Sequence, residues 1–213
     1  MAKSEDMQVL SEVEYEFFEV DENLSFQVFT LNAKHQLKPG KAQQMVLEQK
    51  NLAFDLHFQA FPSQNPLAYR VATIKDWKNL NLLATEVEVF SQGQYIGKQY
   101  LHPATFGALS FGTDARVVVK RQVMQEKDKK QIMGSQMVVE KGYLYSVENN
   151  SNQSIALHIK DRYPYSPNEE VKIEVKSNQN PMNYKPIDGM VEWKLELNPQ
   201  QKAAFEGSYE IKM

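Results

Sequence analysis

The feature that most constrains this chain is the strict alternation of apolar and polar residues in short runs. Residues 53–60 place Phe54, Leu56 and Phe58 on one face, and residues 190–197 repeat the pattern around Trp193. A period of two is that of a β-strand with one buried face. Glycine, asparagine, serine and proline separate the runs, as expected when strands are joined by turns. The chain is therefore predicted to fold from many short strands.

The same pattern predicts further strands, with helix confined to one possible turn at residues 199–204. Around Gly93 the sequence predicts a hairpin, and the polar run 149–153 predicts a second hairpin between its flanking strands. These assignments favour an all-β protein with at least about 40% strand, well above the usual proportion. The additional predicted strands are residues 85–90, 94–101, 116–123, 142–148, 154–163 and 171–176.

Domain organisation is predicted from the polar, glycine-containing segment at residues 111–115. We expect two consecutive antiparallel β-sandwich lobes, an N-terminal one at residues 8–113 and an immunoglobulin-like one at residues 114–213. Four linking residues span at most about 14 Å, so the lobes are expected to meet across a fixed interface. The apolar residues placed to fill it are Leu101, Phe106, Leu109 and Phe111. A strand that crosses from one lobe to the other would also fit this segment.

Charge and composition exclude several classes of function. The 213 residues carry a net charge of −3, with a sequence pI of about 5.9, which lacks the basic footprint of a nucleic-acid-binding protein. The basic residues between 120 and 130 are mixed with acids, so we expect a solvated loop there. No apolar run reaches the length of about 18 residues needed for a membrane span. The polar N-terminal residues do not resemble a signal peptide.

Cysteine is absent, which removes disulfides, thiol nucleophiles and thiolate metal sites. The histidines, His35, His57, His102 and His158, are widely spaced and match no metal-binding motif. Neither a nucleophile elbow nor a phosphate-binding glycine loop occurs in the sequence, and no pair of carboxylates stands out. The sequence therefore predicts a protein that is not an enzyme, with no catalytic, cofactor-binding or metal residues and no cofactor.

Aromatic residues are numerous enough to raise the question of a binding platform. Trp193 shares its face with apolar neighbours, so it is predicted to lie in the core, and the same role is favoured for Trp77. Tyr163 and Tyr165 flank Pro164 at a predicted strand end. Structural packing is favoured for these two tyrosines as well, with exposed contacts as the alternative.

Several motifs follow one another in a fixed order along the chain. They are the hairpin of residues 82–97, the link 109–114, the strand 116–121, the segments 161–166 and 168–175, the closing run 189–199 and a last strand at 208–211. Together they resemble the C-terminal domain of unknown function in the mucoidy inhibitor A family of bacterial envelope proteins. The similarity covers residues 10–213, and departures fall in turns, at Ala84-Thr85 and at residues 198–202.

The resemblance implies a location in the periplasm or cell envelope, and a chain excised from a longer protein with a signal peptide, an N-terminal β domain and a coiled coil. It implies no enzymatic activity and transfers no functional residues. We therefore expect a non-enzymatic interaction or structural module whose partner is a protein or another envelope component. A carbohydrate-binding or accessory module of a polysaccharide-acting system is the alternative, and a hydrolase with an unrecognised site is the third possibility.

Overall fold

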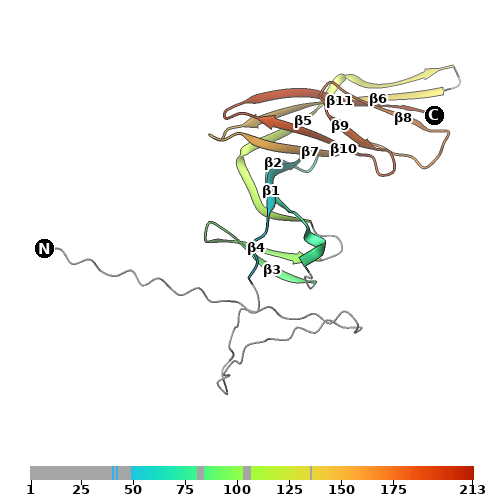
Figure 1. Cartoon of the computed structure of the whole chain (residues 1–213). Coiled ribbons are helices and arrows are strands. Elements are labelled where there is room, and N and C mark those ends of the chain that lie inside the picture. The colour runs from blue at the N-terminus through green and yellow to red at the C-terminus, as the bar shows by residue number, and fades with distance from the viewer. Residues whose placement is uncertain (1–39, 41, 43–48, 81–83, 103–106, 135) are drawn as a thin grey trace, which may run out of the picture. The chain divides into compact units, whose positions relative to one another are not determined.

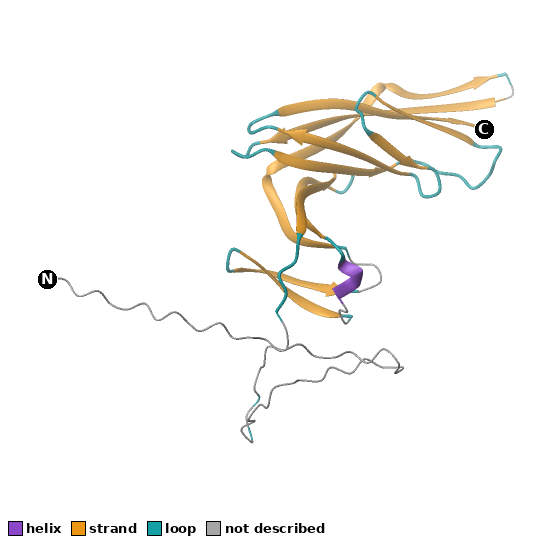
Figure 2. Ribbon diagram, in the orientation of Figure 1, coloured by secondary structure: helices purple, strands orange, loops and turns teal. Residues whose placement is uncertain are grey.

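The structure is a computed structural model that describes residues 40, 42, 49–80, 84–102, 107–134 and 136–213. It is nearly all β, with 70% of these residues in strands, so the predicted class and strand content are confirmed. No helix in this part of the chain is long and apolar enough to cross a membrane. The elements are β1 (Phe54–Phe61), β2 (Asn65–Ile74), the 3-10 helix η1 (Trp77–Leu80), β3 (Thr85–Ser91), β4 (Gln94–Leu101), β5 (Ala108–Met133), β6 (Gln136–Asn149), β7 (Ile155–Arg162), β8 (Lys172–Ser177), β9 (Met182–Lys185), β10 (Met190–Leu197) and β11 (Lys202–Lys212) (Figures 1 and 2).

Nine strands form one open sheet in the order β8-β11-β6-β5-β2-β1-β7-β10-β9, and β3 pairs with β4 in a separate hairpin. The hairpin matches its prediction, with Gly93 at a φ of 75° in the turn. Neighbouring strands of the large sheet are antiparallel except β1 and β7, which run parallel. The prediction of purely antiparallel pairing was wrong at this pair, because β1 and β7 lie far apart in sequence and no turn motif records their contact.

The predicted link at residues 111–115 lies inside β5, which runs through it without a break. This strand pairs with β2 through its first half and with β6 through its second half. One strand therefore crosses the boundary predicted between residues 113 and 114, and the nine-stranded sheet takes strands from both predicted lobes. The chain divides into two compact units, residues 1–52 and 53–213. Every element described above belongs to the second unit.

Two local predictions in the second half of the chain were wrong. Strands β6 and β7 are consecutive but do not form a hairpin, because β6 pairs with β5 and β11 whereas β7 pairs with β1 and β10. The turn after Asn149 therefore carries the chain from one side of the sheet to the other. The basic segment 120–130 is not a loop but part of β5, where Arg121 pairs with Asp161 and Lys127 with Glu206. Arg121 and Lys127 thus have partners distant in sequence, whereas Lys120, Lys129 and Lys130 are exposed to solvent, as predicted.

The main core joins strands from both ends of the sheet order. Trp193 of β10 has no exposed surface, as predicted. Its ring centroid lies 4.9 Å from that of Tyr145 on β6 and 5.1 Å from that of Phe205 on β11. Because β10 lies near one end of the strand order and β11 near the other, the sheet curls until its two wings pack against each other (Figure 1). Gly207 lies at the contact, where a Cβ atom would come within 2.4 Å of the Tyr163 hydroxyl.

A smaller core attaches the β3–β4 hairpin to the large sheet. It consists of Ile74, Trp77 and Leu101, with Leu109 packed against them. Trp77 is therefore buried, as predicted. Beside this core, the Gln99 side-chain amide donates to the Ser110 carbonyl and accepts from the Ser110 amide at 3.2 Å. This pair of hydrogen bonds joins β4 to β5 in the way that one residue pair of a β-ladder would. Phe106, which was expected at this junction, lies outside the described residues.

Candidate interaction surface

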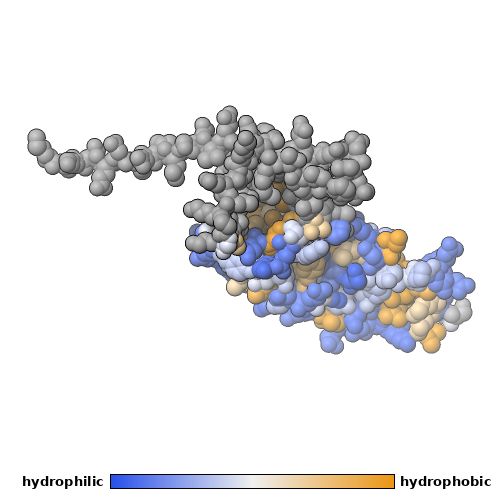
Figure 3. All heavy atoms as spheres, turned by 90° about the horizontal axis from the view of Figure 1, so that it is seen from below, coloured by the Kyte–Doolittle hydropathy of each residue, from blue (hydrophilic) through white to orange (hydrophobic). Residues whose placement is uncertain are grey.

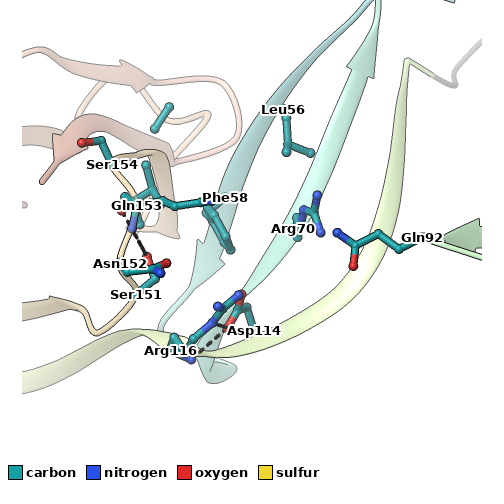
Figure 4. Close-up of a pocket in the computed structure, with 12 residues that line it drawn as sticks. Leu56, Phe58, Arg70, Gln92, Asp114, Arg116, Ser151, Asn152, Gln153 and Ser154 are labelled. Atoms are coloured by element: carbon teal, nitrogen blue, oxygen red, sulfur yellow. Dashed lines mark hydrogen bonds and ion pairs between the residues drawn. The ribbon is translucent and has the colours of Figure 1, made fainter. Parts of the chain in front are cut away.

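A cavity of about 360 Å³ lies where β1 separates from β7. Leu56 and Phe58 of β1 and Arg70 of β2 line one side of it, and β5 and the loop before β7 complete the walls. Figure 4 shows Phe58 and Arg70 together on the strands, opposite the loop of residues 151–154. Gln92, in the turn of the β3–β4 hairpin, also lines the cavity. The hairpin turn and the sheet therefore contribute to one continuous surface.

Strand alternation explains how these side chains come together. Leu56 and Phe58 are two residues apart on β1, so they occupy the same face, and Phe58 pairs with Arg70 across the β1–β2 ladder. The sequence predicted this face to be buried. Ala60 is buried as expected, but the side chains nearer the start of β1 are not, with 43% of Leu56 exposed. The apolar stripe of β1 therefore leaves the core and continues as the floor of the cavity.

Two arginines and one aspartate set the electrostatics of the cavity. Asp114 accepts hydrogen bonds from Nη2 and Nε of Arg116 at 2.6 and 2.9 Å and from the Arg116 amide at 3.0 Å. These bonds lower the pKa of Asp114 below its ordinary value, and the side-chain bond from Arg116 is the largest cause. The Arg70 side chain makes no hydrogen bond or ion pair with any residue that the structure describes. Its charge acts on the Asp114 carboxyl as a weaker cause of the same lowered pKa, and its guanidinium carbon lies 5.9 Å from the Phe111 ring centroid. The cavity thus contains one arginine that is hydrogen-bonded to Asp114 and a second, Arg70, whose side chain donates no hydrogen bond to the described residues.

The loop wall of the cavity is held from behind by Asn149, a fully buried polar residue. Its side-chain amide donates to the carbonyls of Asn198 at 2.8 Å and Gln153 at 2.9 Å, and its Oδ1 accepts from the Ser151 hydroxyl at 2.7 Å. Gln200 adds a bond from its side-chain amide to the Ser151 carbonyl at 2.9 Å. A loop with its polar groups bonded in this way presents a preorganised surface to a ligand.

The outer face of the β3–β4 hairpin carries exposed aromatic side chains. Phe90 and Tyr95 face each other across the ladder, with ring centroids 5.5 Å apart and planes at 62°. Tyr100 lies farther along β4 and is more exposed than either. Between them, Lys98 pairs with Glu86 at 2.8 Å. The Phe90–Tyr95 rings are edge-on, and not the coplanar pair that would suit stacking against a sugar.

A buried polar network lies within the main core. Asp161 has no exposed side-chain surface and accepts from the Tyr145 hydroxyl at 2.6 Å and the Arg162 amide at 2.8 Å. Arg121 forms an ion pair with it, with Nε 3.2 Å from Oδ2, and covers the Tyr143 ring. Burial raises the pKa of Tyr145 far above its ordinary value, so this hydroxyl stays protonated and acts as a donor. A carboxylate bonded on both oxygens has a structural role here, linking the two wings of the sheet.

The histidines do not converge with acids into a metal-binding group in the part of the chain that the structure describes. His57 and His158 stack on the opposite face of the sheet with ring centroids 4.4 Å apart. Desolvation lowers the pKa of both imidazoles. His102 is exposed, and His35 lies outside the described residues.

The two tyrosines that flank Pro164 lie in different environments. Tyr163 is buried in the core, with its hydroxyl 3.1 Å from that of Tyr145, whereas Tyr165 is exposed. Sequence reasoning missed Arg70 and Asp114 as features of interest. The available indication was the apolar stripe of β1, but only the fold shows that this stripe meets two arginines.

Comparison with known proteins gives one finding. A family model described as "Domain of unknown function (DUF4139)" matches residues 2–213. No curated protein and no solved structure shows a significant match to the chain.

Proposed function

The chain belongs to the family of the domain of unknown function DUF4139, and from that premise we propose that it is a non-enzymatic interaction or structural module of a bacterial cell-envelope protein. The envelope location and the relation to mucoidy inhibitor A proteins rest on the ordered motifs at residues 82–97, 161–175 and 189–199. The partner is a protein or another component of the envelope.

The observation that carries this proposal is the aromatic outer face of the β3–β4 hairpin, adjoining the cavity through Gln92. Phe90, Tyr95 and Tyr100 each expose more than half of their surface. Aromatic residues and arginine are enriched in protein interfaces, and exposed apolar groups that gather on one face mark interaction sites. Figure 3 shows apolar side chains among hydrophilic ones on one face of the described residues.

We also propose the β-sandwich as the finer description of the fold, with immunoglobulin-like packing in the C-terminal part. Its support is the contact of Trp193 with Tyr145 and Phe205, which come from the opposite wing of the sheet. The parallel pairing of β1 with β7 is the feature that departs from a standard immunoglobulin arrangement.

The alternative, a carbohydrate-binding module, draws on the hydroxyl and amide groups of residues 151–154 in the cavity wall. Such groups suit hydrogen bonding to sugar hydroxyls. The edge-on Phe90–Tyr95 pair gives it no stacking platform. A glycan array incubated with the labelled chain separates the two proposals, because only the carbohydrate module retains specific glycans.

Site-specific photocrosslinking tests the main proposal. We would replace Tyr95 by p-benzoylphenylalanine in cells that produce the protein naturally, irradiate them, and identify crosslinked proteins by mass spectrometry. Tyr165 is a matched control, because its exposed fraction of 53% nearly equals the 54% of Tyr95. A discrete product from position 95 that is absent from position 165 is expected. Identical products at both positions, or none at position 95, would contradict the proposal.

A further inference from the structure

We propose that the cavity beside β1 binds an extended segment of a partner protein that carries an acidic side chain next to apolar ones. This inference rests on the proposed function as an interaction module and specifies the chemistry of the partner. Backbone, apolar surface and charge each support it.

The backbone argument begins with the ladder between β1 and β7. This ladder comprises three residue pairs, at Phe58, Gln59 and Ala60 of β1. Toward the start of β1, residues 54–57 pair with β2 on one side, and no described strand continues the ladder on the other. A strand edge without a partner offers amides and carbonyls to an added extended chain. The cavity opens at this place, because the loop before β7 and not a strand faces Leu56.

The side chains beside this edge suit an extended chain. Leu56 and Phe58 follow the two-residue period of β1, and Phe54 extends the stripe with 53% of its surface exposed. An added strand presents its own side chains with the same period, so that alternate residues meet this stripe. Apolar side chains at alternate positions of the partner would thereby cover surface that is now in contact with water.

Charge selects an acidic partner. Two arginines line the cavity against one carboxylate, Asp114, which accepts its side-chain hydrogen bonds from Arg116 and senses Arg70 only as a weaker charge. The cavity therefore carries an excess positive charge, and the Arg70 side chain donates no hydrogen bond to the described residues. A carboxylate on the segment would form with Arg70 the paired hydrogen bonds that guanidinium groups favour. Arg70 pairs with Phe58 across the ladder, which places the carboxylate beside the apolar contacts. Because hydrogen bonds already hold the loop wall in place, binding does not have to order it, and the entropic cost of binding is smaller.

The test uses the full 213-residue chain and a phage-displayed library of short random peptides. Selected peptides are synthesised and measured by fluorescence anisotropy against the chain and two variants. Arg70→Gln removes the proposed contact, and Arg162→Gln is the matched control, an exposed arginine that does not line this cavity. Selected peptides are expected to combine Asp or Glu with apolar residues at alternate positions. Arg70→Gln should weaken binding about tenfold or more, and Arg162→Gln should leave it unchanged.

A second variant protects the test against misfolding. Leu56 is partly exposed, so Leu56→Ser is tolerated and should also weaken the selected peptides, while amide resonances of residues 55–58 shift when peptide binds the unaltered chain. Failure to enrich any peptide, or equal binding to Arg70→Gln, would overturn the inference. Arg70-dependent binding of polygalacturonate oligomers without any peptide binding would also overturn it, in favour of an acidic saccharide. None of these outcomes removes a crosslink at position 95, so the proposed function is tested separately.

Discussion

Replacing Gly207 by alanine tests how tightly the two wings of the sheet pack. A Cβ atom there would lie 2.4 Å from the Tyr163 hydroxyl oxygen, 3.1 Å from a Trp193 ring carbon and 3.2 Å from a Tyr145 ring carbon. Overpacking of this kind costs about 1–3 kcal/mol. Alanine also restricts the unfolded chain, which offsets about 0.4–1 kcal/mol. The free energy of unfolding should therefore fall by roughly 1–2 kcal/mol.

Most of that cost comes from one oxygen atom, so a second substitution should relieve it. Tyr163→Phe alone loses the hydrogen bond to Tyr145 and should cost about 1 kcal/mol. Once the hydroxyl is absent, only the ring contacts at 3.1 and 3.2 Å remain, so Gly207→Ala should cost about 1 kcal/mol less than it does in the unaltered chain, which is the expected coupling. Urea titrations monitored by tryptophan fluorescence measure all four proteins. Gly107→Ala, whose Cβ meets nothing within 4 Å, is the control. Additivity of the two substitutions would refute the packing argument.

The remaining predictions address the core, the cavity, the strand that crosses the sheet and bound ligands. Trp193→Ala should lower the free energy of unfolding by about 3–5 kcal/mol in a denaturant titration, and a loss below about 1 kcal/mol would mean that the indole is not packed in the core. An NMR titration should find the pKa of the Asp114 carboxyl below its ordinary value. The stability that this carboxylate contributes is therefore present above its unfolded-state pKa and is lost as the pH falls through its folded-state pKa. Arg116→Gln should raise the Asp114 pKa toward its ordinary value, and an unchanged titration curve would contradict the pairing. Limited proteolysis should spare residues 111–116, since they lie within β5, and rapid cleavage there into two stable fragments would contradict a continuous strand. Metal analysis after dialysis should find no stoichiometric zinc, and one zinc per chain would identify a site that the sequence does not suggest.

Local patterns predicted the elements whose partners are close in sequence. The hairpin of β3 and β4 follows from alternation and from Gly93, and β10 has the bounds expected from the run around Trp193. Pairing between distant segments was not predictable in this way. The polar turn after Asn149 has the composition of a hairpin turn, yet the strands that it connects, β6 and β7, pair with different partners on opposite wings of the sheet. Turn chemistry identifies where a strand ends and carries no information about the strand with which it pairs.

The same limit applies to the candidate site. The stripe of Leu56 and Phe58 was visible in the sequence, and burial was the natural interpretation of an alternating apolar face. Its exposure depends on where β7 begins, which β1 itself does not determine. The positions of Arg70 and Asp114 depend in turn on the register of β2 against β1 and β5. A site formed by three strands and a loop is specified only when all of these registers are known.

Two ionic groups, the Arg121–Asp161 pair in the core and Arg70 in the cavity, show why the cavity and not the core is the place to look for recognition. Asp161 and Arg121 are both engaged, with Tyr145 as an additional donor, and a buried ion pair bonded in this way is costly to disturb. Any ligand that took one of these partners would leave the other buried without compensation. Arg70 differs, because its guanidinium lies next to exposed apolar surface and donates no hydrogen bond to the described residues, although it lies 5.9 Å from the Phe111 ring centroid and its charge acts on Asp114. A carboxylate that meets it gains a charge-assisted hydrogen bond and breaks none, so binding at Arg70 leaves the fold intact.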